Sequence, residues 1–472
     1  MSRNHRSLKE KVWDRRLVSR LARDLASLAA KELTRTGGAV RDPEFLPHIK
    51  RLVRGGFASA DVVPVVSEVV KSSLHLCHPR FSAQQVAAPV PVAALVESVV
   101  AALNNSVAVW DMSPAATVID REVMNLFKRL FGFPSGAEGS SVAGGAYANL
   151  TAFLAARAKL APHAWRRGQA HIAILAGAQT HYSVSRAAGI LGLGADSVFT
   201  IPTDALHRTD PTATRVVFHA ARKAGFRKFI LVATSGSTPT GSCDDLHALA
   251  KIARREGAWL HVDAAHGGGL IFSPRYRHLL RGIECADSIS FDPHKMLFMP
   301  LCASVVLVRD GRYLRNAFEQ SAPYLFGGGK REFPDIGQFT IACSQRFDAL
   351  KTWLTWKAYS GALWDELISS ACDVAHAAYE YCLRSRLLEP AHEPQTNIFC
   401  FGLRERPRSL KASDRLHWAI KDAVNASGEA YISSTVLGGR RLLRMVVMNP
   451  RTTANDIIGV LKVVERVARR VK

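Results

Sequence analysis

The chain has 472 residues, of which 48% are hydrophobic and 22% charged, and its formal net charge is +22. This length exceeds what one hydrophobic core usually supports, so we expect two or three structural units. No uninterrupted apolar stretch of about 18 residues occurs, which argues against a transmembrane helix. The basic N-terminus contains acidic residues and no apolar segment follows it, which argues against a secretory signal and disfavours a mitochondrial address.

Two bulk properties concern compartment and partners. The eight cysteines are scattered and form no CxxC pair, so we predict no metal site and no disulfide framework, but reduced thiols in a cytoplasmic protein. The positive charge fits either an acidic partner such as nucleic acid or a basic surface without a specific function. Because the basic residues are spread along the chain without a zinc-finger or RNA-binding signature, we expect neither a nucleic-acid nor a membrane partner.

Residues 1–104 are predicted to be helical. Leu17, Leu21, Leu25 and Leu28 recur near the 3.6-residue period of an amphipathic helix. The segment is basic and has too few apolar residues to form a core by itself. We therefore expect it to pack on another unit or at the interface with a partner subunit.

Residues 105–350 show short apolar runs that alternate with helical stretches, which predicts an α/β domain with a mostly parallel central sheet. A helix is predicted over 244–257, because this stretch starts with two aspartates, has apolar residues at i, i+3, i+4 and i+7, and ends at Gly257. The runs that we interpret as buried strands are His171–Ala176, Lys228–Thr234, Ala258–Asp263, Ser288–Phe291 and Ala303–Val308.

Residues 351–472 are predicted to form a small α+β C-terminal domain. A long helix follows residue 351, strands are expected near 397–402 and 441–447, and a closing helix begins at Thr453. No internal repeat and no low-complexity linker occurs. The chain therefore divides into three predicted segments, 1–104, 105–350 and 351–472.

Asp263 is the first position with distinctive chemistry. It follows the apolar run Trp259–Val262 and precedes three glycines, so it lies at the carboxyl end of a buried strand. Ligands collect at such strand ends in open α/β sheets. A buried carboxylate needs a cationic partner, because burial of an unpaired charge is unfavourable. A protonated pyridine nitrogen would supply that partner.

Lys295 is the second such position. It lies between the strand Ser288–Phe291 and the apolar run Met296–Met299. Desolvation favours the neutral, nucleophilic amine that Schiff-base chemistry requires. A loop lysine that reaches solvent is the simpler interpretation of this residue alone. Because Asp263 ends a nearby strand, we favour a reactive lysine.

Two further segments could bind an anion. Thr234–Thr238 form a hydroxyl-rich turn after a strand, which suits a phosphate or carboxylate but also an ordinary helix N-cap region. Gly144–Asn149 open the helical run Leu150–Lys159 and offer backbone N–H groups at a helix N-terminus. Neither segment identifies a ligand by itself.

Together these residues resemble the group II pyridoxal-phosphate decarboxylases, the family of glutamate, cysteine sulfinate, diaminobutyrate and aromatic amino-acid decarboxylases. The resemblance covers nearly the whole chain, and the strand-end aspartate followed by Pro-His-Lys is its most specific part. It implies the aspartate aminotransferase-like α/β fold (fold type I), the cofactor pyridoxal 5'-phosphate, and a homodimer with a shared active site. The segments that carry it are His78–Phe81, Asp111–Pro114, Gly144–Asn149, Thr180–Ser185, Asp263–Ala265, Pro293–Lys295 and Arg444–Pro450.

The resemblance implies roles toward the cofactor. Lys295 would carry it as an imine, Asp263 would hold the pyridinium proton, and His181 would stack on the ring. Ala146 stands where small hydroxyl residues are common, and Asp292 where several relatives have asparagine, which puts phosphate contacts from these two side chains in doubt. The positions expected around the phosphate or neighbouring ring atoms are Gly145, Ala146, Thr234, Ala265 and His294.

Tyr324 resembles the family's mobile-loop tyrosine, which is thought to protonate the substrate α-carbon after carbon dioxide leaves. The resemblance implies that its loop, which contains Gly327–Gly329, reaches the neighbouring subunit's cofactor. Relatives with phenylalanine at this site make aldehydes oxidatively, so Tyr324 favours plain decarboxylation. Arg444 resembles the substrate-side arginine, and a structural ion pair is its alternative. The predicted catalytic residues are Lys295, Tyr324 and His181, and the predicted substrate-binding residues are Arg444, Gln84 and Phe81.

The expected reaction converts an L-amino acid to its amine and carbon dioxide, but the sequence leaves the substrate open. The segments around Tyr324, Thr180 and Arg444 favour the branch that acts on acidic substrates such as glutamate, aspartate or cysteine sulfinate. Pro390–Thr396 and Ala342–Leu350 favour the diaminobutyrate branch. Polar anchors for the substrate side chain are limited to Gln84 and Gln395. The alternatives are another reaction of the same cofactor (carbon–carbon lyase, transaminase or aldehyde synthase) and a non-enzymatic basic binding protein.

Overall fold

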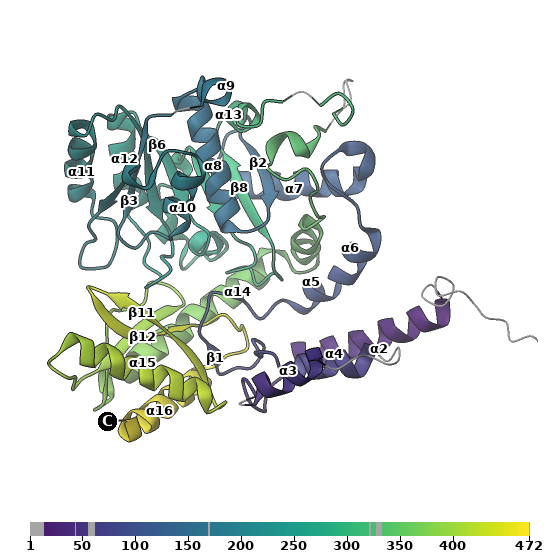
Figure 1. Ribbon diagram of the computed structural model, residues 1–472, viewed down its shortest axis with the longest axis vertical. Coiled ribbons are helices and arrows are strands. Elements are labelled where there is room, and N and C mark those ends of the chain that lie inside the picture. Colours follow the sequence, from purple (N-terminus) through teal and green to yellow (C-terminus); the bar gives the residue numbers. More distant parts are fainter. Residues whose placement is uncertain are drawn as a thin grey trace, which may run out of the picture.

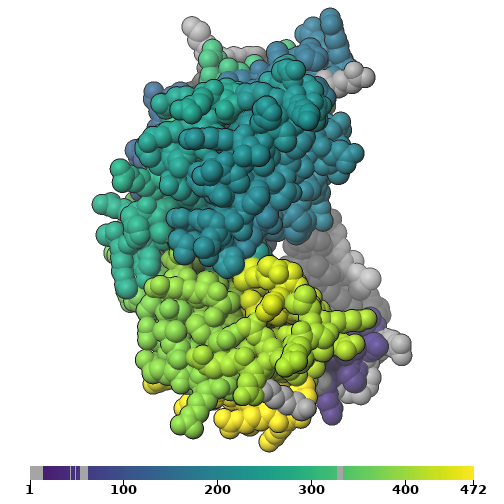
Figure 2. Space-filling view, turned by 90° about the vertical axis from the view of Figure 1, so that its left-hand side faces the viewer, coloured from purple at the N-terminus to yellow at the C-terminus, as the bar shows by residue number. Residues whose placement is uncertain are grey.

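The computed structural model describes residues 14–42, 44–54, 62–168, 170–320, 322–326 and 333–471. Its described part contains one sheet of seven strands and one of five. Figure 1 shows each sheet in its own half of the molecule. Figure 2 shows the teal half packed against the half that is coloured green to yellow.

The seven-stranded sheet is the centre of the α/β domain. Its strands are β2 (Glu138–Val142), β3 (Ile172–Gly177), β4 (Val198–Ile201), β5 (Lys228–Thr234), β6 (Trp259–Asp263), β7 (Ser288–Phe291) and β8 (Ser304–Val308). Their order is β2-β8-β7-β6-β5-β3-β4. The strands from β7 to β4 in this order pair in parallel, and β8 runs in the opposite direction, so it pairs antiparallel with both β2 and β7. The predicted mostly parallel sheet is therefore confirmed.

Helices cover both faces of this sheet. They are α7 (Pro114–Leu130), α8 (Gly145–Leu160), α9 (Ala164–Arg167), α10 (Ser183–Ile190), α11 (Pro211–Lys223), α12 (Leu246–Glu256) and α13 (Gly311–Asn316). Alternate residues of β5 belong to different cores: Leu231 packs in the cluster that contains Phe127 of α7, and Ile230 in the cluster that contains Ala152 of α8. Strands buried on both faces form continuous apolar runs, which is why the sequence revealed them.

The predicted strands correspond to β3, β5, β6, β7 and β8, and the predicted helix at 244–257 corresponds to α12. The Asp245 side chain caps this helix by accepting a hydrogen bond from the Ala248 N–H at 2.9 Å. Gly257 ends it with a φ of 64°. β2 and β4 were not predicted, because β2 is rich in Gly and Ser and β4 is a half-buried edge strand.

The C-terminal part forms the smaller sheet with helices packed on it, as predicted. Its elements are α14 (Ala349–Arg384), β9 (Leu388–Pro390), β10 (Ile398–Leu403), α15 (Leu410–Ala426), β11 (Tyr431–Leu437), β12 (Arg440–Val446) and α16 (Ala454–Val471). β9 to β12 pair antiparallel. The expected strands near 397–402 and 441–447 are β10 and β12, and the expected closing helix is α16.

The N-terminal segment is mainly helical, with α2 (Arg15–Leu33), α3 (Phe45–Arg54), α4 (Val62–Lys71), α5 (Pro91–Leu95) and α6 (Glu97–Leu103). It also contributes β1 (Phe81–Ser82), which pairs in parallel with β11 at the edge of the smaller sheet. α2 and α4 have no buried residue, and Figure 1 shows them extending away from the rest of the molecule. The boundaries at 104 and 350 stay predictions.

In the part of the chain that the structure describes, six short 3-10 helices connect these elements: η1 (Trp110–Met112), η2 (Ala195–Ser197), η3 (Gly267–Phe272), η4 (Arg277–Leu280), η5 (Ile283–Cys285) and η6 (Ile336–Phe339). η3 follows β6 after the short segment 264–266, so it helps to position the residues that follow Asp263. Within the described ranges, no helix is both long and apolar enough to cross a membrane.

Candidate active site

A cavity of about 250 Å³ lies at the carboxyl ends of β5, β6 and β7, next to the N-terminus of α8. The residues predicted around a cofactor all line it, so the fold brings them together from five separate segments. The lining residues are Gly144, Gly145, Ala146, Asn149, His181, Thr234, Gly236, Thr238, Asp263, Ala265, His266, Asp292, His294, Lys295, Leu301 and Cys302.

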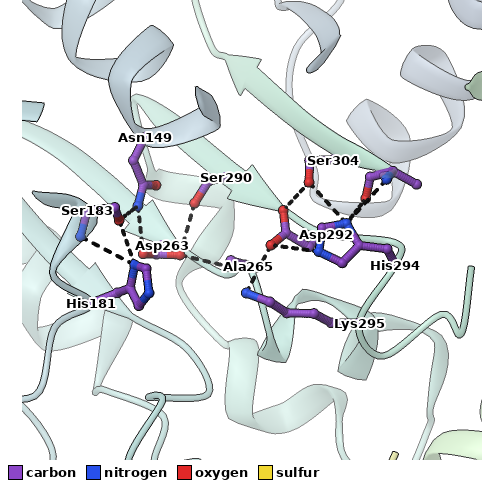
Figure 3. A network of polar contacts seen from close by, with 11 residues as sticks. Asn149, His181, Ser183, Asp263, Ala265, Ser290, Asp292, His294, Lys295 and Ser304 are labelled. Atoms are coloured by element: carbon purple, nitrogen blue, oxygen red, sulfur yellow. Dashed lines mark hydrogen bonds and ion pairs between the residues drawn. The ribbon is translucent and has the colours of Figure 1, made fainter. Parts of the chain in front are cut away.

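Asp263 is held by three neutral donors (Figure 3). Its carboxylate accepts hydrogen bonds from Asn149 Nδ2 at 2.9 Å, Ser290 Oγ at 3.0 Å and the Ala265 N–H at 3.1 Å. Burial opposes ionisation of this carboxyl, but the charge of Lys295 and the hydrogen bonds lower the pKa of Asp263 below its ordinary value. The described residues form no ion pair with this carboxylate, so it is available to a cationic ring nitrogen in the cavity.

A directed chain of hydrogen bonds supports this carboxylate from the core. The Ser288 hydroxyl lies 2.9 Å from His261 Nδ1, and His261 Nε2 donates to Asn149 Oδ1 at 3.0 Å. Burial lowers the pKa of His261 to about 4, so the ring is neutral near pH 7 and carries the proton on Nε2. Because Asn149 Nδ2 donates to Asp263, Asn149 Oδ1 must accept, and this fixes the proton of His261 on Nε2.

The same amide also orients His181. Asn149 Nδ2 donates to Ser183 Oγ at 2.9 Å, and this hydroxyl lies 2.8 Å from His181 Nδ1. Burial is the main cause that lowers the pKa of His181, so the imidazole is neutral. A neutral ring in a fixed orientation suits stacking on an aromatic cofactor.

Lys295 lies in the turn after β7, at the other end of the cavity. Its Nζ is 2.9 Å from Asp292 Oδ2 (Figure 3). Residues 296–299 after it are buried, as the apolar run Met296–Met299 predicted. His294 Nδ1 lies 2.8 Å from the Ala303 carbonyl, and burial is the main cause that lowers the pKa of His294. Lys295 is thus the amine that faces the cavity from this turn.

The N-terminus of α8 offers backbone N–H groups to an anion. Gly145 cannot be replaced without strain, since a Cβ there would lie 2.6 Å from Asp292 Oδ2. Opposite, Thr234 ends β5 and its Oγ1 lies 3.4 Å from Thr180 Oγ1. An anion-binding helix end, a carboxylate for a ring nitrogen and an amine for an aldehyde fit the three functional ends of pyridoxal phosphate.

Several predicted residues lie outside this cavity. Tyr324 is 90% exposed, and Gln84 is exposed. Phe81 is 1% exposed and stacks on Tyr431 with ring centroids 5.9 Å apart, so it belongs to the core beside β1. The Gln395 side-chain oxygen accepts a hydrogen bond from the Cys243 N–H at 2.9 Å. The substrate-binding roles of Phe81 and Gln84 and the catalytic role of Tyr324 stay predictions, as do the cofactor-binding roles of the cavity residues.

Arg444 on β12 is a buried guanidinium with unused donors. It is 7% exposed, and its Nη1 lies 3.2 Å from Ser433 Oγ. Its Nε and Nη2 have no hydrogen-bond partner among the described residues. Burial is the main cause that lowers the pKa of Arg444. A structural ion pair, the alternative interpretation, does not occur within the described residues.

His266 joins the two halves of the molecule beside the cavity. Its Nε2 donates to Asn397 Oδ1 at 2.7 Å, and Asn397 Nδ2 donates to the Val447 carbonyl at 2.7 Å. Burial, aided by Lys295, lowers the pKa of His266 to about 3, so this ring is neutral as well. Among the described residues, no group of three His, Cys, Asp or Glu side chains could hold a metal ion.

Sequence reasoning did not assign roles to Asn149, Ser183, His261, Ser290 and His266. Asn149 and Ser183 stand inside quoted motifs, so their position was a usable signal. His261 and Ser290 point into the domain from the middle of buried strands, where the pattern shows only that they are polar. Contacts across about 100 positions of sequence, such as Asn149 to His261, leave no local signal.

The model of one protein family, described as the pyridoxal-dependent decarboxylase conserved domain, matches residues 60–404. The chain belongs to the pyridoxal-dependent decarboxylase family. This result confirms the predicted family, the decarboxylase class and pyridoxal phosphate as the cofactor.

Individual family members are similar over most of the chain. An L-2,4-diaminobutyrate decarboxylase of Rhizobium meliloti (strain 1021) is 31% identical over 438 residues, which cover 92% of this chain and 86% of that protein. The cysteine sulfinic acid decarboxylase of Rattus norvegicus is 31% identical over 476 residues and 96% of each chain. The crystal structure of mouse CSAD matches with a TM-score of 0.90 and 28% identity over 96% of this chain and 99% of that one. The predicted fold type I is thereby confirmed.

Proposed function

We propose that this decarboxylase removes the α-carboxylate of an acidic or diamino L-amino acid and releases the corresponding amine and carbon dioxide. Two groups of relatives support this substrate range. The first group is named for 2,4-diaminobutyrate. The second group is named for acidic substrates: cysteine sulfinic acid in the protein of Rattus norvegicus, and acidic amino acids in a protein of Bos taurus that is 30% identical. The candidate substrates are therefore 2,4-diaminobutyrate, cysteine sulfinate, glutamate and aspartate.

The observation that carries the proposal is the pair Asp263 and Lys295 facing one cavity. Bound pyridoxal phosphate supplies an electron sink for the electron pair that remains when carbon dioxide leaves. Asp263 stays ionised through its three donors and so keeps a ring nitrogen protonated. Lys295 supplies the attaching amine, and the neutral His181 ring limits the orientations of the cofactor ring.

Arg444 is proposed to hold a carboxylate of the substrate. A guanidinium binds a carboxylate through two parallel N–H···O bonds, and Arg444 has Nε and Nη2 unoccupied by any described residue. Because the side chain is buried, water does not weaken such a contact.

We also propose a homodimer in which Tyr324 completes the neighbouring active site and returns a proton to the substrate α-carbon. Tyr324 is 90% exposed and does not line the cavity of its own chain. α2 and α4 have no buried residue in the single chain, although both are amphipathic. A partner subunit that covers them would bury these apolar faces. Gel filtration of a fully active monomer would contradict this assembly.

We propose the cytoplasm as the compartment. All eight cysteines are free thiols. Most of them are buried, and burial raises the pKa of Cys400 to about 12, which keeps this thiol protonated and unreactive. Such a set of thiols is typical of reducing compartments.

The test uses the purified protein loaded with pyridoxal phosphate. Each of the four candidate amino acids is incubated with it, and carbon dioxide, amine, ammonia and peroxide are measured. Amine and carbon dioxide in equal amounts are the expected products, with Lys295→Ala as the inactive control. A 2-oxo acid as the main product would indicate a transaminase, and aldehyde with ammonia and peroxide would indicate an aldehyde synthase.

A further inference from the structure

A second buried aspartate, Asp292, shares the cavity with Asp263. Its side chain is 1% exposed, and its Oδ1 accepts a hydrogen bond from Ser304 Oγ at 2.5 Å. It lies against Gly145 at the N-terminus of α8. The cofactor chemistry proposed above gives this buried acid no role.

The cation that Asp292 binds is Lys295. Lys295 Nζ lies 2.9 Å from Asp292 Oδ2, whereas the next group near this oxygen, His294 Nε2, is 3.7 Å away. His294 is neutral near pH 7, because burial lowers its pKa and outweighs the opposite effect of the contact between its Nδ1 and the Ala303 carbonyl. The carboxylate is therefore balanced by the lysine and not by the histidine.

We propose that Asp292 is a positioning residue that holds Lys295 as an ammonium whenever the lysine is not bonded to the cofactor, and that it thereby slows cofactor capture. The hydroxyl of Ser304 fixes one carboxylate oxygen, so the other oxygen stays directed at Lys295. An acid at this distance stabilises the charged form of an amine. Asp292 also keeps the released lysine close to the α8 end of the cavity during turnover.

The chemistry of capture explains the slowing. Lys295 attacks an aldehyde carbon only as the free amine, so its ammonium must first lose one proton. The nitrogen then bonds to the carbon, its two remaining protons leave with the aldehyde oxygen as water, and a carbon–nitrogen double bond remains. Each capture therefore requires that the contact between the Lys295 ammonium and Asp292 be broken.

Other ionisable groups also face Lys295. They are Asp263 from the end of β6, His266 just after it, His181 from the start of α10 and His294 from its own turn. The three histidines are neutral near pH 7, because burial lowers the pKa of each. Asp263 is saturated with donors from neutral groups. Asp292 is therefore the acid that Lys295 contacts directly.

The test measures cofactor capture by the cofactor-free full-length protein, without substrate. Asp292→Asn and wild type are mixed with pyridoxal phosphate or with pyridoxal, and the rate of covalent attachment is followed by absorbance and by borohydride trapping with mass spectrometry of Lys295. We expect Asp292→Asn to capture both aldehydes about tenfold faster at neutral pH, and the two proteins to converge at high pH, where both lysines are free amines. Asp373→Asn, which removes a charge from an exposed ion pair with Arg275, is the matched control and should capture at the wild-type rate.

Three outcomes overturn the proposal. Capture by Asp292→Asn at or below the wild-type rate shows that the carboxylate assists attachment or only supports the fold. Faster capture of pyridoxal phosphate alone shows that Asp292 acts on the phosphate and not on the lysine. A difference that persists at high pH shows a cause other than the charge of the amine. Thermal unfolding checks that the variant is folded, and Asp292→Ala replaces it if it is not.

The proposal rests on the proposed cofactor chemistry, but the two fail separately. A protein that captures pyridoxal phosphate on Lys295 and decarboxylates none of the four amino acids refutes the substrate assignment alone. Equal capture rates in an active decarboxylase refute only the role of Asp292.

Discussion

Asp263 and Asp292 are buried acids at the ends of neighbouring strands, and they are stabilised in opposite ways. Asp263 is held by the neutral donors Asn149, Ser290 and Ala265, whereas Asp292 pairs with the cation Lys295. Neutral donors stabilise an anion without cancelling its charge, so Asp263 keeps a full charge for a ligand. An ion pair within the chain satisfies both partners and must be broken before either can act.

The largest test of this contrast replaces each acid by its amide. Asp263→Asn removes the charge that keeps a ring nitrogen protonated, so we expect turnover with saturating cofactor to fall about 10³-fold. Asp292→Asn should change the same turnover number by no more than about tenfold, because the amide still accepts from Ser304. Steady-state assays of amine release measure both. Equal losses in the two variants would contradict the division of roles.

The loss of a hydrogen-bond donor to Asp263 should have the next largest effect on turnover. Asn149→Leu removes the amide that holds Asp263 and, through Ser183, His181. A hydrogen bond to a charged group contributes about 1.5–3 kcal/mol, so turnover should fall about 10- to 100-fold. Thr151→Val on the same helix is the control, since the buried Thr151 hydroxyl has no partner among the described residues. If the two variants behave alike in the amine-release assay, the amide has no special role.

Arg444 extends the comparison, because it is a buried cation that has no acidic partner among the described residues. Arg444→Met should raise the KM for the amino acid about tenfold, with a smaller change in kcat, because a contact to the substrate carboxylate is lost. Its unfolding free energy should not fall, since the variant removes a buried charge with unused donors. Arg441→Met on the same strand is the control. A large loss of stability without a change in KM would favour a structural role.

The smallest expected effect concerns His266 and pH. The folded-state pKa of His266 is about 3 and its ordinary value is 6.5, so below pH 6.5 the unfolded chain takes up a proton that the folded chain does not. Stability from this group is therefore present above that pH and is lost as the pH falls toward 3.

Replacing His266 tests this sign. As the pH falls from 6.5 to about 5, one such histidine lowers the free energy of unfolding by about 2 kcal/mol. In urea unfolding, His266→Gln should therefore lose about this much less stability than wild type over the same pH range. The exposed His376→Gln is the control. An unchanged pH dependence in His266→Gln would show that this ring is not held neutral by the fold.

The sequence was sufficient for the parts of the fold that repeat a local pattern. The strands β5, β6 and β7 are buried on both faces, so they appear as apolar runs, and the polar residues that end them stand out. The edge strand β4 and the Gly- and Ser-rich β2 lack such a pattern and were missed. The contact between Phe81 and Tyr431 left no local signal either, because β1 pairs with β11 far along the chain; the substrate-binding role of Phe81 stays a prediction.

By itself, the sequence determined the parallel sheet and the family, and it predicted Asp263 and Lys295 as the reactive positions, because burial periodicity and short motifs are local properties of the chain. Only the tertiary structure decided how charge is distributed between Asp263, Asp292 and Arg444. The state of each group depends on the direction of hydrogen bonds from distant residues, such as His261 to Asn149, and on whether a partner of opposite charge is within reach. Those contacts exist only after the strands and helices have packed.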